Sequence, residues 1–179
     1  MPSIYFEKQV ASLCGQHLLN NLLQGKYFEA SDLADIALEL DQKERELGLS
    51  VDALRQESHN VDAGGNFSIQ VLETALEKLF SIKLLRDDAV EKALKTIDDQ
   101  SETESNIEQI AFAFNFENHW FCSRYLYHRF WILNSLEERP QPISRTMLTM
   151  YVSQIKAEGW SVFVTSGTLP QISKNEDSS

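Results

Sequence analysis

The residues of this chain best suited to nucleophilic or metal chemistry are its cysteines and histidines. Cys14 precedes Gly15 at the start of an apolar segment, which predicts a helix ending near Gln24 with Ser12 as its N-cap. In the first turn of a helix, unpaired backbone N–H groups and the helix dipole stabilise a thiolate, and the glycine leaves room for a substrate backbone. Cys14 is therefore a candidate nucleophile; a small buried hydrophobe is the alternative.

A cysteine nucleophile needs a general base, and position in a predicted hairpin distinguishes one histidine. Residues 119–125 and 129–136 have the composition of neighbouring strands. If residues 125–128 form the loop between them, His119 lies opposite Asn134, and opposed side chains share one face of a sheet. The candidates for the base are His17, His59, His119 and His128.

The same register pairs Trp120 with Leu133, and Cys122 with Trp131, on the other face of the hairpin. The first face then carries His119 and Asn134, against which the helix of Cys14 would pack.

Cysteine, histidine and asparagine, in this chain order, form the constellation of papain-like hydrolases. The imidazole of His119 would take the proton of the Cys14 thiol, and the amide of Asn134 would hold the ring. Gln9, five residues before Cys14, could donate its side-chain NH₂ to an oxyanion.

A zinc site is the competing interpretation of the same residues. Cys14-x-x-His17 and His119-x-x-Cys122 have the spacing of a zinc quartet. Residues three apart in a strand point to opposite faces, so Cys122 would face away from His119. We therefore expect no metal and no cofactor.

Composition and charge limit the possible partners and compartment. The chain has 179 residues and a net charge of −11, which disfavours nucleic acid because phosphates require a basic surface. No apolar segment reaches the ~18 residues that a membrane span needs, and the N-terminus lacks the pattern of a secretory signal. With only two cysteines, a disulfide framework is excluded, and we expect a reducing cytoplasmic or nuclear location.

Hydrophobic periodicity predicts one α+β domain, with helices first and an antiparallel sheet last. Helices are expected over residues 12–24, from 31 onward, 50–58, 69–80, 87–99 and 144–159. Strands are expected over 81–86, 110–116, 119–125, 129–136 and 160–166, with loops at 98–109 and 137–144.

Four segments together resemble the Josephin domain family: SLCGQHLLNNLLQGKYF, FSIQVLETAL, ENHWF and WILNSL. The resemblance implies a papain-like cysteine protease fold, in which N-terminal helices pack on a C-terminal antiparallel sheet. It implies a catalytic domain over residues 1–169, a protruding helical hairpin over the cleft at residues 31–65, and a frayed tail at 170–179.

The resemblance also implies a deubiquitinase that hydrolyses the peptide or isopeptide bond after the C-terminal glycine of ubiquitin. Its partners would be ubiquitin and ubiquitin conjugates. The family roles are nucleophile for Cys14, base for His119, orienter for Asn134 and oxyanion donor for Gln9. The family's ubiquitin contacts match Ile69, Gln70 and Trp120 at one surface and Tyr27 and Phe28 at a second, where Leu79 stands at a tryptophan position.

Two other function classes remain open at this point. A Cys–His acyltransferase would use the same nucleophile, but such enzymes pair the histidine with aspartate rather than asparagine. A ubiquitin-binding module without turnover would keep the apolar contacts and lose the catalytic residues.

Overall fold

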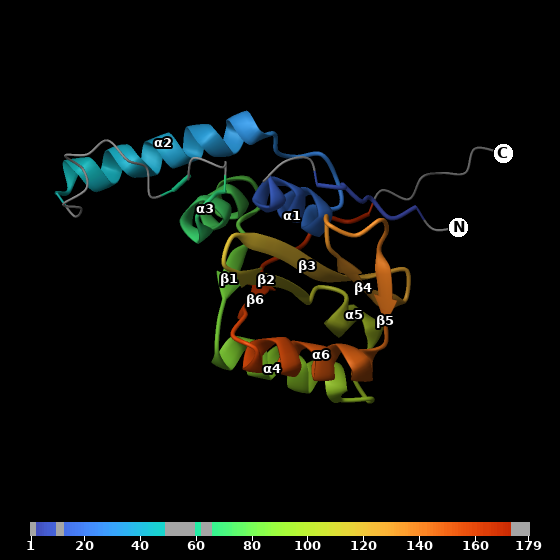
Figure 1. Cartoon of the computed structure of the whole chain (residues 1–179). Coiled ribbons are helices and arrows are strands. Elements are labelled where there is room, and N and C mark those ends of the chain that lie inside the picture. The colour runs from blue at the N-terminus through green and yellow to red at the C-terminus, as the bar shows by residue number, and fades with distance from the viewer. Residues whose placement is uncertain (1–2, 10–12, 49–59, 62–65, 173–179) are drawn as a thin grey trace.

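A computed structural model of the chain describes residues 3–9, 13–48, 60–61 and 66–172. Its centre is an antiparallel sheet with helices on both faces (Figure 1). Helices α1 (Cys14–Leu23) and α3 (Ile69–Phe80) cover one face, and α2 (Ala30–Glu46) packs beside α3. Helices α4 (Asp88–Asp98) and α6 (Arg145–Ala157) cover the other face, together with the short α5 (Glu104–Ile107). The predicted α+β class is confirmed.

The sheet has the strand order β1-β6-β2-β3-β4-β5, and all of its pairs are antiparallel. The last strand in sequence therefore lies between the first two, and the β2–β3–β4 hairpins form the other half. The strands are β1 (Lys83–Leu85), β2 (Ala111–Phe116), β3 (His119–Leu126), β4 (Arg129–Leu133), β5 (Gln141–Ile143) and β6 (Ser161–Ser166).

Alternation along β2 determines what each face of the sheet packs against. Ala111 and Ala113 face the core that α1 and α3 cover, whereas Phe112 and Phe114 face the core under α4 and α6. Helix α1 itself lies mainly against β3, the strand beside β2. Nine of the ten residues of α1 are buried, so this helix is a central element rather than an amphipathic surface helix.

The start of α1 differs from prediction in two ways. Leu13 occupies the N-cap position and supplies no side-chain cap, and Ser12 lies outside the described residues. Gly15 does not face a substrate channel: a Cβ there would lie 3.3 Å from a Leu72 methyl group. Because Gly15 has no side chain, α1 can pack closely on α3 at this position.

The first helix of the predicted hairpin at 31–65 is α2, which packs on α3 and extends beyond the sheet in Figure 1. Its partner helix at 50–58 and the Gly64-Gly65 joint lie outside the described residues. Asn60 ties α2 to the start of α3. Its side chain donates to Asp41 at 2.7 Å and accepts from the Ser68 hydroxyl at 2.8 Å.

Two short elements occur where loops were predicted. Strand β5 forms at the edge of the sheet, where Pro142 costs no ladder hydrogen bond on the solvent side. Helix α5 forms one turn within the acidic segment. At the other end, Pro170 is held by Arg124, and Ile172 packs on the core. Within the described ranges, no helix is long and apolar enough to cross a membrane.

Candidate active site

Cys14 is the first residue of α1, directly over the turn that joins β2 to β3. It is 2% exposed, and its Sγ donates to the carbonyl oxygen of Asn118 at 3.0 Å. Asn118 immediately precedes His119, so the candidate nucleophile lies at the end of β3 from which the candidate base emerges. The position in the first helical turn retains the electrostatic advantage expected for a thiolate.

The predicted register of the β3–β4 hairpin is wrong by two residues. Cys122 pairs with Leu133, and Trp131 with Arg124, so the loop is only Tyr127-His128. Both loop residues adopt positive φ, 50° and 67°, the geometry of a tight turn that usually requires glycine or asparagine. Contacts elsewhere in the fold hold it, because the Tyr127 hydroxyl donates to the Ser3 carbonyl and His128 binds Glu104.

A shift of two residues leaves every side chain on its original face. His119 and Asn134 therefore become diagonal neighbours instead of opposed ones, still within reach of each other. The Nε2 of His119 lies 3.0 Å from Oδ1 of Asn134.

A second hydrogen bond defines the chemistry of this pair. The Leu136 backbone N–H donates to the same Oδ1 at 3.1 Å, which identifies that atom as the oxygen of the amide. An amide oxygen only accepts, so Nε2 of His119 carries the hydrogen. In the neutral ring, Nδ1 is then the atom that can accept a proton.

Aromatic rings surround the His119 imidazole. It stacks on Phe121, with centroids 5.9 Å apart, and forms a T-shaped pair with Trp160, with centroids 6.3 Å apart. Burial lowers the pKa of His119 below its ordinary value, and the hydrogen bond to Asn134 opposes this shift. The neutral ring, the form that acts as a base, is thus favoured at neutral pH.

Gln9 is fixed to the residue that follows Asn134. Its backbone N–H donates to the Ser135 carbonyl at 2.7 Å, and its Oε1 accepts from the Ser135 hydroxyl at 3.1 Å. Three regions thus carry the four candidate residues. Cys14 lies at the start of α1, His119 at the start of β3 and Asn134 just after β4, and Gln9 in the N-terminal segment. Their roles in a reaction stay predictions.

The residues predicted to contact ubiquitin differ in accessibility. Ile69 is partly buried and Gln70 exposed at the start of α3, whereas Trp120 is 5% exposed and stacks on Phe163. Tyr27 is 42% exposed, but Phe28, at 2%, belongs to the core. Leu79 is exposed, and the ring beside Tyr27 is Phe80, 5.0 Å away.

A cavity of about 320 Å³ lies beside the Cys14 contact. Asn118, whose carbonyl accepts from Cys14, is part of its wall together with Ile69 and Trp120. The remaining lining residues are Asn66, Phe67, Ser68, Arg86, Asn115, Glu117, Ser161 and Phe163.

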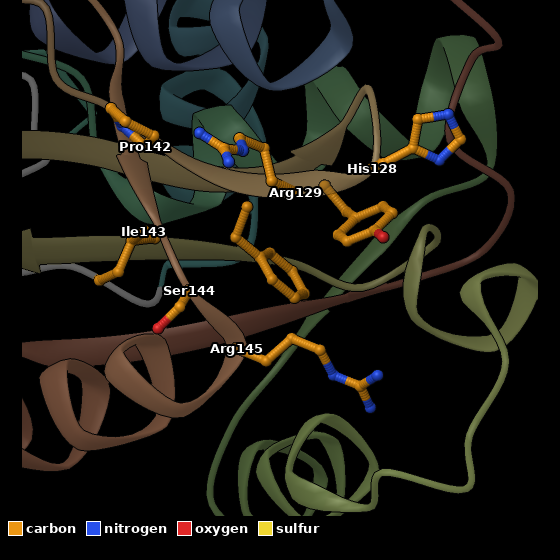
Figure 2. A pocket seen from close by; sticks show the side chains of 8 residues that line it. His128, Arg129, Pro142, Ile143, Ser144 and Arg145 are labelled. Atoms are coloured by element: carbon orange, nitrogen blue, oxygen red, sulfur yellow. The ribbon is translucent and has the colours of Figure 1, made fainter.

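A second cavity, of about 430 Å³, lies where β4, β5 and the start of α6 meet (Figure 2). It contains none of the predicted site residues. Its polar groups have structural partners: Ser144 Oγ caps α6, and the Arg145 guanidinium donates to the carbonyls of Ile97 and Asp99. The first cavity is lined by two of the predicted ubiquitin contacts, Ile69 and Trp120, whereas Cys14, His119, Asn134 and Gln9 line neither of these two cavities.

Cys122 belongs to the core on the face of β3 opposite to His119. The expectation that the helix of Cys14 packs on the face of His119 and Asn134 is wrong, because α1 packs on the Cys122 face, whereas Phe121, on the face of His119, belongs to the core under α4 and α6. Burial raises the pKa of its thiol to about 12, so it is protonated at neutral pH. Its Sγ contacts the carbonyls of Leu18 and Leu133 at 4.0 and 3.9 Å. No group of three or more metal-ligating side chains occurs in the part of the chain that the structure describes.

Sequence reasoning missed Ser135 and Trp160. The contact of Ser135 with Gln9 spans more than a hundred residues, and no residue pattern announces it. Trp160 comes from the segment between α6 and β6. The serine adjacent to a candidate catalytic asparagine was the only available signal.

Comparison with known proteins identifies the family of this chain. A sequence model of the Josephin family matches residues 9–166. Ataxin-3 from Rattus norvegicus is 41% identical over 178 residues, which cover 95% of this chain and 48% of the relative. Human ataxin-3 has the same identity, with 95% and 47% covered, and an ataxin-3 homolog from Arabidopsis thaliana is 36% identical, with 94% and 60% covered. The chain spans about half the length of the first two relatives, and it belongs to the Josephin family.

Proposed function

We propose that this chain is a cysteine-dependent deubiquitinase, which hydrolyses the bond after the C-terminal glycine of ubiquitin. The observation that carries the proposal is the hydrogen bond between His119 and Asn134, which leaves Nδ1 as the proton acceptor at the end of β3 where Cys14 lies. Membership of the Josephin family supports the substrate.

In the reaction, Nδ1 of His119 takes the Cys14 thiol proton, and Sγ attacks the carbonyl carbon of the terminal glycine. The side-chain amide of Gln9 donates to the oxyanion that forms. His119 returns the proton to the leaving amine as the C–N bond breaks, which leaves a thioester. Water, deprotonated by His119, then hydrolyses the thioester and restores the thiol.

The thiol must change partner before attack. In the structure its hydrogen is directed to the Asn118 carbonyl, and the sulfur is almost fully covered. Catalytic hydrogen bonds are often formed only in the substrate complex, so this arrangement is compatible with a resting state. Ubiquitin and its conjugates are the proposed partners, and Ile69, Gln70 and Tyr27 are the proposed contacts that reach the surface.

The decisive test is reaction with ubiquitin that carries a C-terminal electrophile. We expect a covalent adduct with the wild-type chain and with Cys122→Ala, and none with Cys14→Ala, which should still bind ubiquitin. The Cys122 variant is the matched control, since it removes the other buried thiol. An adduct with a well-folded Cys14→Ala protein, or none with the wild type, would contradict the proposal, and binding without any adduct would instead favour a non-catalytic module.

A further inference from the structure

Ser135 is a buried residue that binds Gln9 at two points. It is 2% exposed, and its carbonyl accepts from the Gln9 backbone N–H at 2.7 Å. Its hydroxyl donates to Oε1 of the Gln9 side chain at 3.1 Å. One residue thus fixes both the main chain and the carboxamide of Gln9.

The turn that contains Ser135 also fixes Asn134. The Glu137 N–H donates to the Asn134 carbonyl at 2.9 Å, and the Leu136 N–H donates to Asn134 Oδ1 at 3.1 Å. An asparagine whose side chain accepts from the backbone two residues later stabilises a turn of this kind. A single turn therefore orients the partner of His119 and contacts Gln9.

The segment before Gln9 is anchored independently. The Glu7 N–H donates to Asn21 Oδ1 at 2.7 Å, and the Glu7 carboxylate binds His17 Nδ1 at 2.7 Å. Because α1 holds the main chain in this way, losing the Ser135 hydroxyl would remove a contact of the carboxamide and leave the segment in place.

We propose that Ser135 is the positioning residue for the oxyanion-binding amide of Gln9, an inference that rests on the proposed function. The hydroxyl binds the oxygen end of the carboxamide, so the NH₂ end is directed away from Ser135. The hydroxyl favours this orientation over the one rotated by half a turn, in which the amide oxygen would repel an oxyanion instead of stabilising it.

The test compares Ser135→Ala, Gln9→Ala and the double variant in hydrolysis of ubiquitin with a fluorogenic C-terminal amide. Removing an oxyanion donor costs about 10²-fold or more in kcat, and we expect misorienting it to cost about tenfold, with KM changed less than about twofold. In the Gln9→Ala background, Ser135→Ala should cause no further loss, because the two residues act as one unit.

Two controls separate positioning from general damage. Ser123→Ala deletes an equally buried hydroxyl with no hydrogen-bond partner among the described residues, so its kcat should not change. Alkylation of Cys14 by iodoacetamide needs the thiolate but no oxyanion donor, so its rate should be the same in Ser135→Ala and wild type.

The outcomes are distinct. Three results would each overturn the inference and leave the proposed function intact. The first is that Ser135→Ala lowers kcat equally in the wild-type and Gln9→Ala backgrounds. The others are that Ser135→Ala also slows the alkylation of Cys14, or that it keeps full activity. Absence of turnover in the wild-type chain would overturn the proposed function and, with it, the inference.

Discussion

At the scale of single residues, the candidate site depends on which nitrogen of His119 carries the hydrogen. Two donors, Nε2 of His119 and the N–H of Leu136, converge on one oxygen of Asn134. That convergence fixes the amide orientation and, through it, the tautomer of the ring. An asparagine suits this role because its oxygen orients a neutral or charged imidazole without adding charge.

Substitution of the histidine and of the asparagine should have unequal effects on hydrolysis. His119→Ala removes both the proton acceptor for the thiol and the donor for the leaving amine, so we expect activity to fall by about 10²- to 10⁴-fold. Asn134→Ala should cost less, because the ring loses its orienting bond and keeps its chemistry. Steady-state kcat/KM for a ubiquitin amide measures both, and a larger loss in Asn134→Ala would argue against these assignments.

A second prediction concerns the pKa of His119. Burial lowers this pKa, so between the folded value and the ordinary value of about 6.5 the unfolded chain binds more protons. The contribution to stability is therefore complete above about pH 6.5 and is lost as the pH falls through the folded pKa.

Trp160 packs against this ring in a T-shaped pair, so Trp160→Leu should raise the pKa of His119 toward its ordinary value. NMR titration of the ring C–H signals in the Cys14→Ala background measures the shift without coupling to the thiol. An unchanged or lowered pKa would show that burial by Trp160 is not the cause.

At the scale of elements, α2 is held to the body mainly through α3. It buries only Leu33, Ala37 and Asp41, and Asp41 is bound by Asn60. Few buried apolar contacts make local opening easier than in α1, nearly all of which is buried. We expect lower hydrogen-exchange protection in α2 than in α1.

Asn60→Ala should weaken this attachment further, since it leaves the buried carboxylate of Asp41 without that donor. Leaving a buried group unsatisfied costs about 1–3 kcal/mol, so protection factors in α2 should fall by about tenfold while those in α4 stay constant. Asn106→Ala, which removes an exposed amide, is the matched control. If Asn60→Ala lowered the protection factors of α2 and α4 equally, Asn60 would not be a local attachment of α2.

At the scale of the whole molecule, Arg124 joins three distant parts of the chain. This buried residue of β3 donates to the carbonyl of Leu22, in the last turn of α1, at 2.7 Å and to that of Pro170, beyond β6, at 2.6 Å. Burial lowers the pKa of its guanidinium to about 10, so the group remains charged at neutral pH. A cation at a helix C-terminus is also favoured by the helix dipole.

Arg124→Met keeps most of the side-chain volume and removes both hydrogen bonds. We expect a loss of about 1–3 kcal/mol in the free energy of unfolding, because the carbonyls of Leu22 and Pro170 lose their donor. Urea denaturation measures it, with the exposed Arg139→Met expected to stay within about 0.5 kcal/mol of wild type. Equal stability of the two variants would mean that the desolvation of Arg124 cancels its hydrogen bonds.

The amino-acid sequence by itself determined helices α1 to α4 and α6 and the main strands, since their apolar periods are long and regular. It also determined that His119 and Asn134 share a face and that Cys122 does not. Side chains along a strand alternate between the two faces with a period of two. An error of two residues in register therefore changes which residues are opposed but leaves each side chain on its face.

Only the tertiary structure decided the actual register, the attachment of Gln9 and the use of Gly15. The loop Tyr127-His128 contains neither glycine nor asparagine, and its contacts with Ser3 and Glu104 stabilise it from distant parts of the chain. Gln9 accepts a hydrogen bond from Ser135, which is far away in the sequence, and Gly15 lies against Leu72 where α1 packs on α3. Such contacts depend on where elements meet in space, and the local residue types that specify each element carry no information about that meeting.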